Sequence, residues 1–169
     1  MVKKRRNAAG YTLTEAMLVV GILGVVIGTG AQIMIQAQRY FILTKTRMDL
    51  QREARAAMYV ITRELRQAQT STITIDQAAN TQPFYSRISF LKTQDSTLLQ
   101  FYQIGNNLVQ KKGNNIKTIT NHLVYLAFAF PRSDDLSIIS VSMTLQENIF
   151  QGRTKALHMA SEKVQIMNN

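Results

Sequence analysis

A run of 23 residues without a charged side chain, residues 16–38, constrains this chain more than any other feature. As a helix the run is about 35 Å long, which exceeds the roughly 30 Å hydrocarbon core of a bilayer. Glycine weakens a water-soluble helix, but in a membrane it lets two helices approach closely, and Gly24 and Gly28 form a GxxxG spacing. The sequence therefore predicts a membrane-spanning helix with a candidate packing face at Gly24 and Gly28.

Charges at the start of the chain indicate how this helix is oriented and where it needs a partner. A basic tract at residues 3–6 precedes the run, and the positive-inside rule places such a tract in the cytoplasm, with the C-terminal part across the membrane. Glu15 lies at the entrance of the run. A carboxylate near the bilayer centre costs about 3 kcal/mol, and less at the edge. We expect Glu15 to have a cationic partner, the alternative being an unpaired side chain that reaches the membrane surface.

The order of these features differs from that of a conventional secretory signal, in which a small-residue cleavage site follows the apolar core. Here Gly10 precedes the core, so that cleavage after Gly10 would leave the apolar helix on the mature protein. Small residues also occur at 28–31. A conventional cut there, releasing a soluble domain, is the alternative.

Gly10, Tyr11 and Glu15, placed after the basic tract, resemble the class III leader of the type IV pilin-like proteins. The resemblance implies that a prepilin peptidase cuts after Gly10 and N-methylates Tyr11, and that Glu15 pairs with the N-terminal amine of a neighbouring subunit in a helical filament. Two departures are Tyr11, where Phe is usual, and Gln32, where the family commonly has Pro. The chain has no Cys, so it lacks the disulfide frequent in major pilins, which favours a minor pilin or pseudopilin.

Beyond the membrane segment, residues 39–69 have the pattern of an amphipathic helix. Apolar residues recur at intervals of three and four, at Leu50, Ala54, Ala57, Ile61, Leu65 and Ala68. The opposite side carries Arg52, Arg55, Arg63 and Arg66. We expect the apolar side to pack on a sheet and the arginines to be solvated, with contacts to lipid headgroups, acidic partners or neighbouring subunits as alternatives. Residues 63–68 also resemble the end of the long helix in J-type minor pseudopilins of type II secretion and W-type minor pilins.

The C-terminal half predicts an antiparallel sheet. Residues 70–85 are polar and interrupted by Pro83, which indicates a connecting loop. Alternation at 139–146 predicts a strand with one buried face, and apolar residues at 124–130 predict a strand covered on both sides. Turn residues occur at 105–107, 112–115, 131–135 and 151–152. Residues 155–167 fit either a helix or a strand, and the J-type and W-type resemblance favours a strand.

The predicted fold class is therefore α+β and pilin-like, with a long N-terminal helix under a C-terminal antiparallel sheet of five to seven strands. Its predicted parts are a leader (1–10), a transmembrane and filament-core half-helix (11–38), an extracytoplasmic half-helix (39–69), a loop (70–85) and a β head (86–169).

The sequence contains no motif or residue spacing that is typical of catalysis. His122 and His158 stand alone, without a second ligand at metal-binding spacing. Asp134 and Asp135 follow Pro131 in a predicted turn and indicate turn capping rather than Ca²⁺ binding. We therefore expect no catalytic residue, metal or cofactor, and a chain that is an enzyme's substrate rather than an enzyme.

The resemblance implies a minor pilin or pseudopilin of the inner membrane, single-pass with its head in the periplasm, that enters an extracytoplasmic filament near its tip. The implied partners are prepilin peptidase, other pilin or pseudopilin subunits, the inner membrane, and a secreted substrate or surface. The filament could serve protein secretion, pilus extension or DNA uptake, and the sequence does not distinguish these three roles.

Nucleic acid is a less favoured partner. The net charge is +10, but four of the positive charges lie in the leader, so that the mature chain would carry +6. A remaining alternative is an uncleaved membrane anchor whose basic helix binds anionic lipid or nucleic acid.

Overall fold

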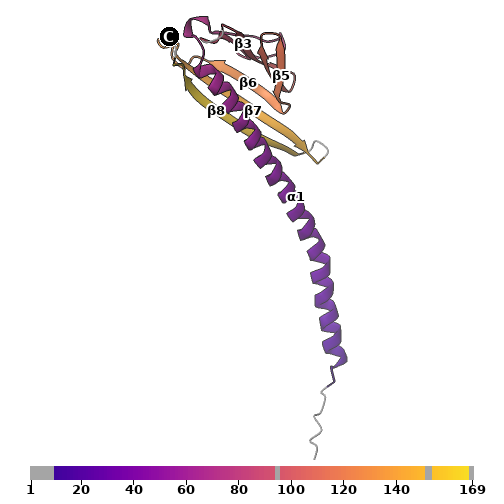
Figure 1. Cartoon of the computed structure of the whole chain (residues 1–169). Helices are drawn as coiled ribbons and strands as arrows, with labels where there is room; N and C mark the ends of the chain where they lie inside the picture. The colour runs from indigo at the N-terminus through magenta and orange to yellow at the C-terminus, as the bar shows by residue number, and fades with distance from the viewer. Residues whose placement is uncertain (1–9, 94–95, 151–153, 168–169) are drawn as a thin grey trace, which may run out of the picture. The chain divides into compact units, whose positions relative to one another are not determined.

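A computed structural model describes residues 10–93, 96–150 and 154–167. They form one long helix followed by eight strands in two antiparallel sheets, which confirms the predicted α+β class (Figure 1). The chain divides into an N-terminal unit, residues 1–42, and a C-terminal unit, residues 43–169. The division falls within the helix.

The helix, α1, comprises Leu13–Arg66. Thr12 caps its start, because the backbone amide of Glu15 donates to both the carbonyl and the side-chain oxygen of Thr12, at 3.1 and 3.3 Å. A carboxylate in the first turn is also favoured by the helix dipole. At the other end Gln67 and Ala68 donate to carbonyls three residues back, and the chain then pairs with the end of the second strand through the bridge Ala68↔Lys92.

The first sheet has five strands that follow one another in the order β1-β2-β3-β4-β5. They are β1 (Thr74–Asp76), β2 (Arg87–Leu91), β3 (Leu98–Ile104), β4 (Asn107–Lys112) and β5 (Asn115–Thr120). Gly105 and Gly113 each open a two-residue turn, both with φ +57°. Glycine at the first turn position with positive φ is typical of hairpin turns of type II′, which explains why the turn signals predicted both hairpins.

The second sheet has the order β6-β7-β8, formed by β6 (Leu123–Ala129), β7 (Ile138–Ile149) and β8 (Thr154–Gln165). The last strand confirms the preference for a strand at residues 155–167. The predicted turn at 151–152 lies outside the described residues. The two sheets meet where Phe128 donates its amide to the carbonyl of Tyr85 (2.9 Å) and Leu123 donates to that of Asn106 (2.8 Å).

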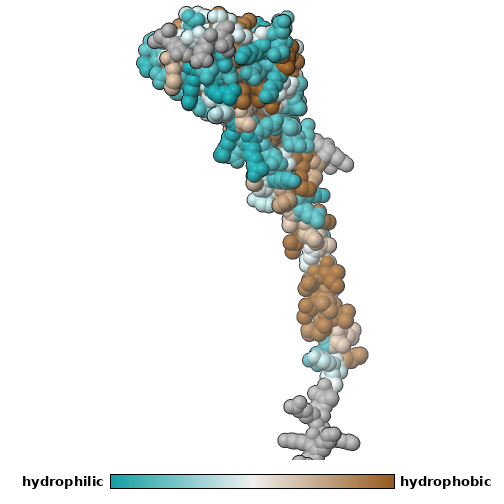
Figure 2. Space-filling view, viewed as in Figure 1, coloured by the Kyte–Doolittle hydropathy of each residue, from teal (hydrophilic) through white to brown (hydrophobic). Residues whose placement is uncertain are grey.

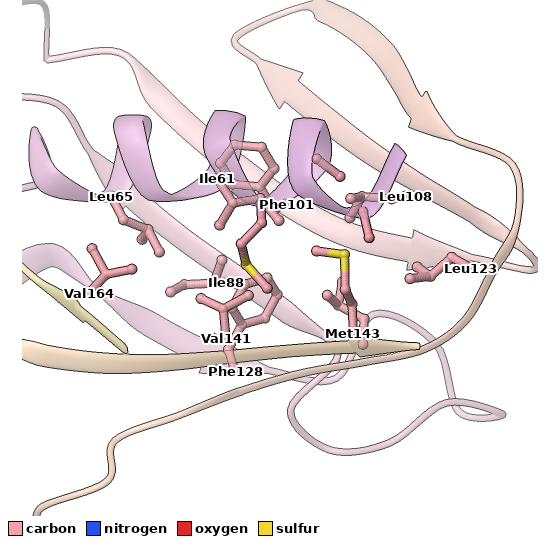
Figure 3. Close-up of a cluster of buried hydrophobic side chains, with 14 of the residues drawn as sticks. Ile61, Leu65, Ile88, Phe101, Leu108, Leu123, Phe128, Val141, Met143 and Val164 are labelled. Carbon is pink, nitrogen blue, oxygen red and sulfur yellow. The ribbon is translucent and has the colours of Figure 1, made fainter. Parts of the chain in front are cut away.

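The core lies between the two sheets and the part of α1 that belongs to the C-terminal unit. All six residues of the predicted apolar stripe are buried, from Leu50 to Ala68. Figure 3 shows Ile61 and Leu65 beside Phe101 and Ile88 of the first sheet and Val141 of the second. Burial of these side chains, at about 25 cal/mol per Å² of apolar surface, holds the helix on the sheets.

Three expectations about the sheets differ from the structure. The described strands number eight in two sheets, rather than five to seven in one. The predicted loop 70–85 contains a 3₁₀ turn (Thr70–Thr72) and the short strand β1, whose three residues are too few to show a period.

Strand β6 is not covered on both sides as predicted. Its register shifts between Leu123 and Tyr125, so that Val124 and Tyr125 are exposed while Leu126 and Phe128 are buried. A bulge adds one residue to one strand of a pair, and therefore breaks the alternation that sequence periodicity assumes.

Candidate membrane anchor and assembly surface

The described part of the N-terminal unit is an apolar helix whose residues are exposed. Every described residue from 10 to 42 is exposed. Its most apolar 18-residue window has a mean hydropathy of 2.2 and is nowhere buried, so α1 is long and apolar enough to span a membrane. Figure 2 shows hydrophobic residues along this part of α1 and hydrophilic residues over much of the visible face of the C-terminal unit.

Such exposure is costly in water. Contiguous apolar surface of this kind marks a membrane or protein interaction site. The N-terminal unit therefore requires lipid or other apolar helices around it.

The residues of the leader motif lie at the start of this helix. Gly10 and Tyr11 are exposed and precede the first turn, and Glu15 lies in that turn. No basic side chain among the described residues forms an ion pair with Glu15. Lys3, Lys4, Arg5 and Arg6 lie outside the described residues. The structure thus shows that Gly10, Tyr11 and Glu15 are exposed.

Thr12 is a contributor that the sequence reasoning missed. A Thr followed three residues later by Glu is a recognised helix-start pattern, and Thr12 and Glu15 have this spacing. The cap places the beginning of α1 at Leu13, directly after Thr12. Cleavage after Gly10 would therefore leave only Tyr11 and Thr12 ahead of the helix.

The candidate packing glycines are unobstructed. A Cβ added at Gly24 or Gly28 meets no atom within 4 Å among the described parts of the chain. The two residues lie one helical turn apart, on one side of α1. Nothing within the described chain therefore requires glycine at these positions, and a requirement would come from a second helix.

The four arginines of the basic face are exposed but differ in their surroundings. Arg52 lies 3.9 Å from Asp49 one turn earlier. Arg63 contacts the carboxylate of Glu64 at 2.9 Å and lies 6.0 Å from the ring centre of Tyr59. Arg55, Arg63 and Arg66 line a groove of about 950 Å³ whose other side is formed by residues of β8. The structure therefore brings three of the four arginines together.

His122 and Asp135 form contacts with neighbouring protein groups. His122 places Nδ1 2.9 Å from Oε2 of Glu53, which ties the start of β6 to α1. Asp135 accepts hydrogen bonds from the amide and hydroxyl of Ser137, so it caps the turn as predicted, and these bonds hold the pKa of its carboxyl below the ordinary value. In the described part of the chain, no three His, Cys, Asp or Glu side chains come together as metal ligands.

Comparisons with known proteins add no assignment to this geometry. No family model matches the chain, no curated protein matches it, and no solved structure matches it. The arrangement of a long apolar N-terminal helix followed by antiparallel sheets is pilin-like and compatible with single-pass anchoring in a membrane.

Proposed function

We propose that this chain is a minor pilin or pseudopilin, an inner-membrane subunit that is processed after Gly10 and assembles through its N-terminal helix into a pilus-like or secretion filament. One observation carries the proposal. The helix from residue 13 to residue 42 is exposed on all sides, and the carboxylate of Glu15 in its first turn has no basic partner among the described residues.

Processing would supply the missing partner. Cleavage after Gly10 creates an α-amine on Tyr11, which is cationic near neutral pH and remains cationic when methylated. In a membrane an isolated subunit holds Glu15 near the lipid boundary at a cost. A neighbouring helix that brings its own α-amine to Glu15 removes that cost, so pairing between subunits fixes their stagger and favours assembly.

The proposed role is structural, without a reaction catalysed by this chain. The apolar half of α1 serves first as a lipid anchor and then as the filament core, while the C-terminal unit is displayed across the membrane. The partners are prepilin peptidase, the inner membrane, other filament subunits, and a secreted substrate or surface. The basic tract supports an N-terminus in the cytoplasm.

The decisive experiment is the identification of the N-terminus of the protein from its native membrane, by peptide mass spectrometry that detects an added methyl group. A chain that starts at Tyr11 supports prepilin processing. A start at Gln32 would show a soluble domain released from a conventional signal, and an intact Met1 or Val2 would show an ordinary membrane anchor. Either of these two results overturns the proposal.

A second experiment separates processing from assembly. Glu15→Leu should still be cut after Gly10 but should not cross-link to other subunits in the filament, whereas Glu15→Asp, which keeps the charge, should retain part of the assembly. Met17→Leu is the matched control, since it alters a neighbouring exposed side chain without changing charge. Normal assembly of Glu15→Leu would contradict the proposed pairing.

A further inference from the structure

Residues of β8 line the groove beside the basic face of α1. Strand β8 is the outer strand of the β6-β7-β8 sheet, and among the described residues no other strand pairs with its second edge. The groove is lined on one side by α1 residues that include Arg55, Arg63 and Arg66, and on the other by residues 158–162 of β8. All of these residues belong to the C-terminal unit.

The register of the sheet determines which backbone groups of β8 are available. Ile166 donates its amide to the carbonyl of Ser137, the residue just before β7 (2.8 Å). From the next pair, Ile138↔Gln165, the pairing of β7 with β8 continues without a register shift. In an antiparallel pair such contacts recur every second residue. The even-numbered residues of β8 therefore bond to β7, and the odd-numbered residues direct their N–H and C=O groups away from it.

The next odd-numbered residue shows where this outer edge faces. Met167 donates its amide to the carbonyl of Arg66, at 3.4 Å, at the end of α1. Earlier in β8, the odd-numbered residues Met159 and Ser161 also direct their backbone N–H and C=O groups away from β7, and both residues line the groove. The groove thus has donors and acceptors in the arrangement that another extended chain requires.

The charge of the groove indicates which kind of extended segment it can bind. No acidic side chain of the described residues forms an ion pair with Arg55 or Arg66, and Arg63 shares Glu64 with Lys92. Glu162 is the acid that lines the groove, against these three arginines. Even without the basic tract at residues 3–6, this protein carries a net charge of +6, so a second copy would bring mainly positive charge to a positive surface.

We propose that the groove binds an extended acidic segment of another protein, which adds as a fourth strand to the outer edge of β8 and places carboxylates against Arg55, Arg63 and Arg66. Main-chain hydrogen bonds to β8 hold the segment, and the arginines select its charge. The proposal uses only the C-terminal unit and is independent of processing after Gly10 and of filament assembly.

The test uses the full chain in detergent micelles and a fluorescent peptide of about eight residues in which Glu alternates with Val, a length typical of strands. Binding is measured by anisotropy and compared with a Lys-Val peptide and with the Glu-Val peptide N-methylated on alternate amides. The Glu-Val peptide should bind, the Lys-Val peptide should not, and N-methylation should abolish binding. Added salt should weaken binding, because the contacts are solvent-accessible charges.

Two protein variants test the two halves of the groove. Arg55→Glu with Arg66→Glu should weaken binding about tenfold or more, since attraction becomes repulsion at two positions. Arg52→Glu, on the same helix but outside the groove lining, is the charge-matched control and should bind as the parent does. Met159→Pro removes an outward N–H that bonds to no other strand, and should also weaken binding, whereas Met159→Val keeps that N–H and should not.

Several results would overturn the proposal. Equal binding of the Glu-Val and Lys-Val peptides would show an apolar surface without charge selection. Binding that survives N-methylation and Met159→Pro would show that strand addition does not occur. Tighter binding of an oligothymidylate than of the Glu-Val peptide would assign the arginines to nucleic acid.

Discussion

Glu64 in the last turn of α1 and Lys92 immediately after β2 form an ion pair that is almost sealed from solvent, with side chains 7% and 12% exposed. Arg63 contacts the same carboxylate, at 2.9 Å from Oε1. Burial alone would raise the pKa of Glu64, but the hydrogen bonds and charges of Lys92 and Arg63 outweigh burial and hold its pKa below the ordinary value of 4.5. This pair joins the end of the helix to the five-stranded sheet.

Removing the cation from this pair should destabilise the C-terminal unit. In Lys92→Met the carboxylate of Glu64 stays buried with Arg63 as its remaining partner, and we expect a loss of about 2 kcal/mol in the free energy of unfolding. Urea unfolding of the full chain in micelles, followed by circular dichroism of the sheets, measures the loss. The control is Arg132→Met, which breaks an ion pair with Asp134 whose side chains are 61% and 67% exposed, and should cost less than about 1 kcal/mol. Equal losses in the two variants would contradict the importance of burial.

The stability of the C-terminal unit should fall in acid. Two hydrogen bonds from Arg87, at 2.7 and 2.5 Å, hold the pKa of Asp76 below its ordinary value of 3.8, against the opposing effect of burial. Because Asp76 and Glu64 have lower pKa values in the folded state, the unfolded state binds protons first as the pH falls. Their stabilisation is complete above the ordinary values, 4.5 for Glu64 and 3.8 for Asp76, and is lost as the pH falls below them.

This pH dependence can be assigned with one substitution. Asp76→Asn should reduce the slope of unfolding free energy against pH below the ordinary pKa of 3.8, with little effect on the slope contributed by Glu64. Urea unfolding at a series of pH values gives both slopes. An unfolding free energy that stays constant between about pH 5 and pH 2 would show that these pairs do not stabilise the fold.

Phe101 should be among the most sensitive core positions. Its ring is buried and stacks with that of Phe90, with 6.3 Å between the ring centres and an angle of 29°. Phe101→Ala removes this contact and leaves a cavity, and we expect a loss of about 4 kcal/mol in unfolding free energy. Ile116→Ala is the control, since Ile116 lies on β5 with 64% of its surface exposed and should change stability by less than about 0.5 kcal/mol. A loss below that of the control would place Phe101 outside the stabilising core.

Gly24→Leu and Gly28→Leu should separate folding from helix association. Because a Cβ at either position meets no atom of the described chain within 4 Å, the unfolding of the C-terminal unit should not change. If a second helix packs at these glycines, a leucine prevents close approach, and cross-linking between subunits in the membrane should fall. Gly30→Leu is the control, since Gly30 is equally unobstructed but lies on another side of the helix. Unchanged cross-linking of both variants would exclude this packing face.

Sequence periodicity predicted the burial of the helix residues correctly. Leu50, Ala54, Ile61 and Leu65 are buried as predicted, because a helix of 3.6 residues per turn places residues three and four apart on one side whatever lies opposite. Gly105 and Gly113 indicated hairpins because few other residues adopt a positive φ. Val124 is exposed although the alternation predicted that it is covered. The bulge beside it depends on how β6 pairs with β7, which local sequence does not reveal.

The candidate sites divide in the same way. The apolar run and the residues Gly10, Tyr11 and Glu15 before it could be found from the order of residues, because the length and composition of a membrane-spanning segment belong to one contiguous stretch. The sequence could not reveal which distant residues meet. The contacts of Glu64 with Lys92 and of Glu53 with His122 each join residues far apart in the chain, and so does the groove between the arginines of α1 and β8.

The long helix, its apolar and basic sides, and the antiparallel character of the C-terminal half follow from the order of residues, because helix and strand periods and turn residues act over a few neighbouring positions. The division of the strands into two sheets, the absence of a partner at the second edge of β8 among the described residues, and the burial of particular charges became known from the packed fold. The physical reason is that strand partners and burial depend on the packing of all elements together, and no local preference contains that information.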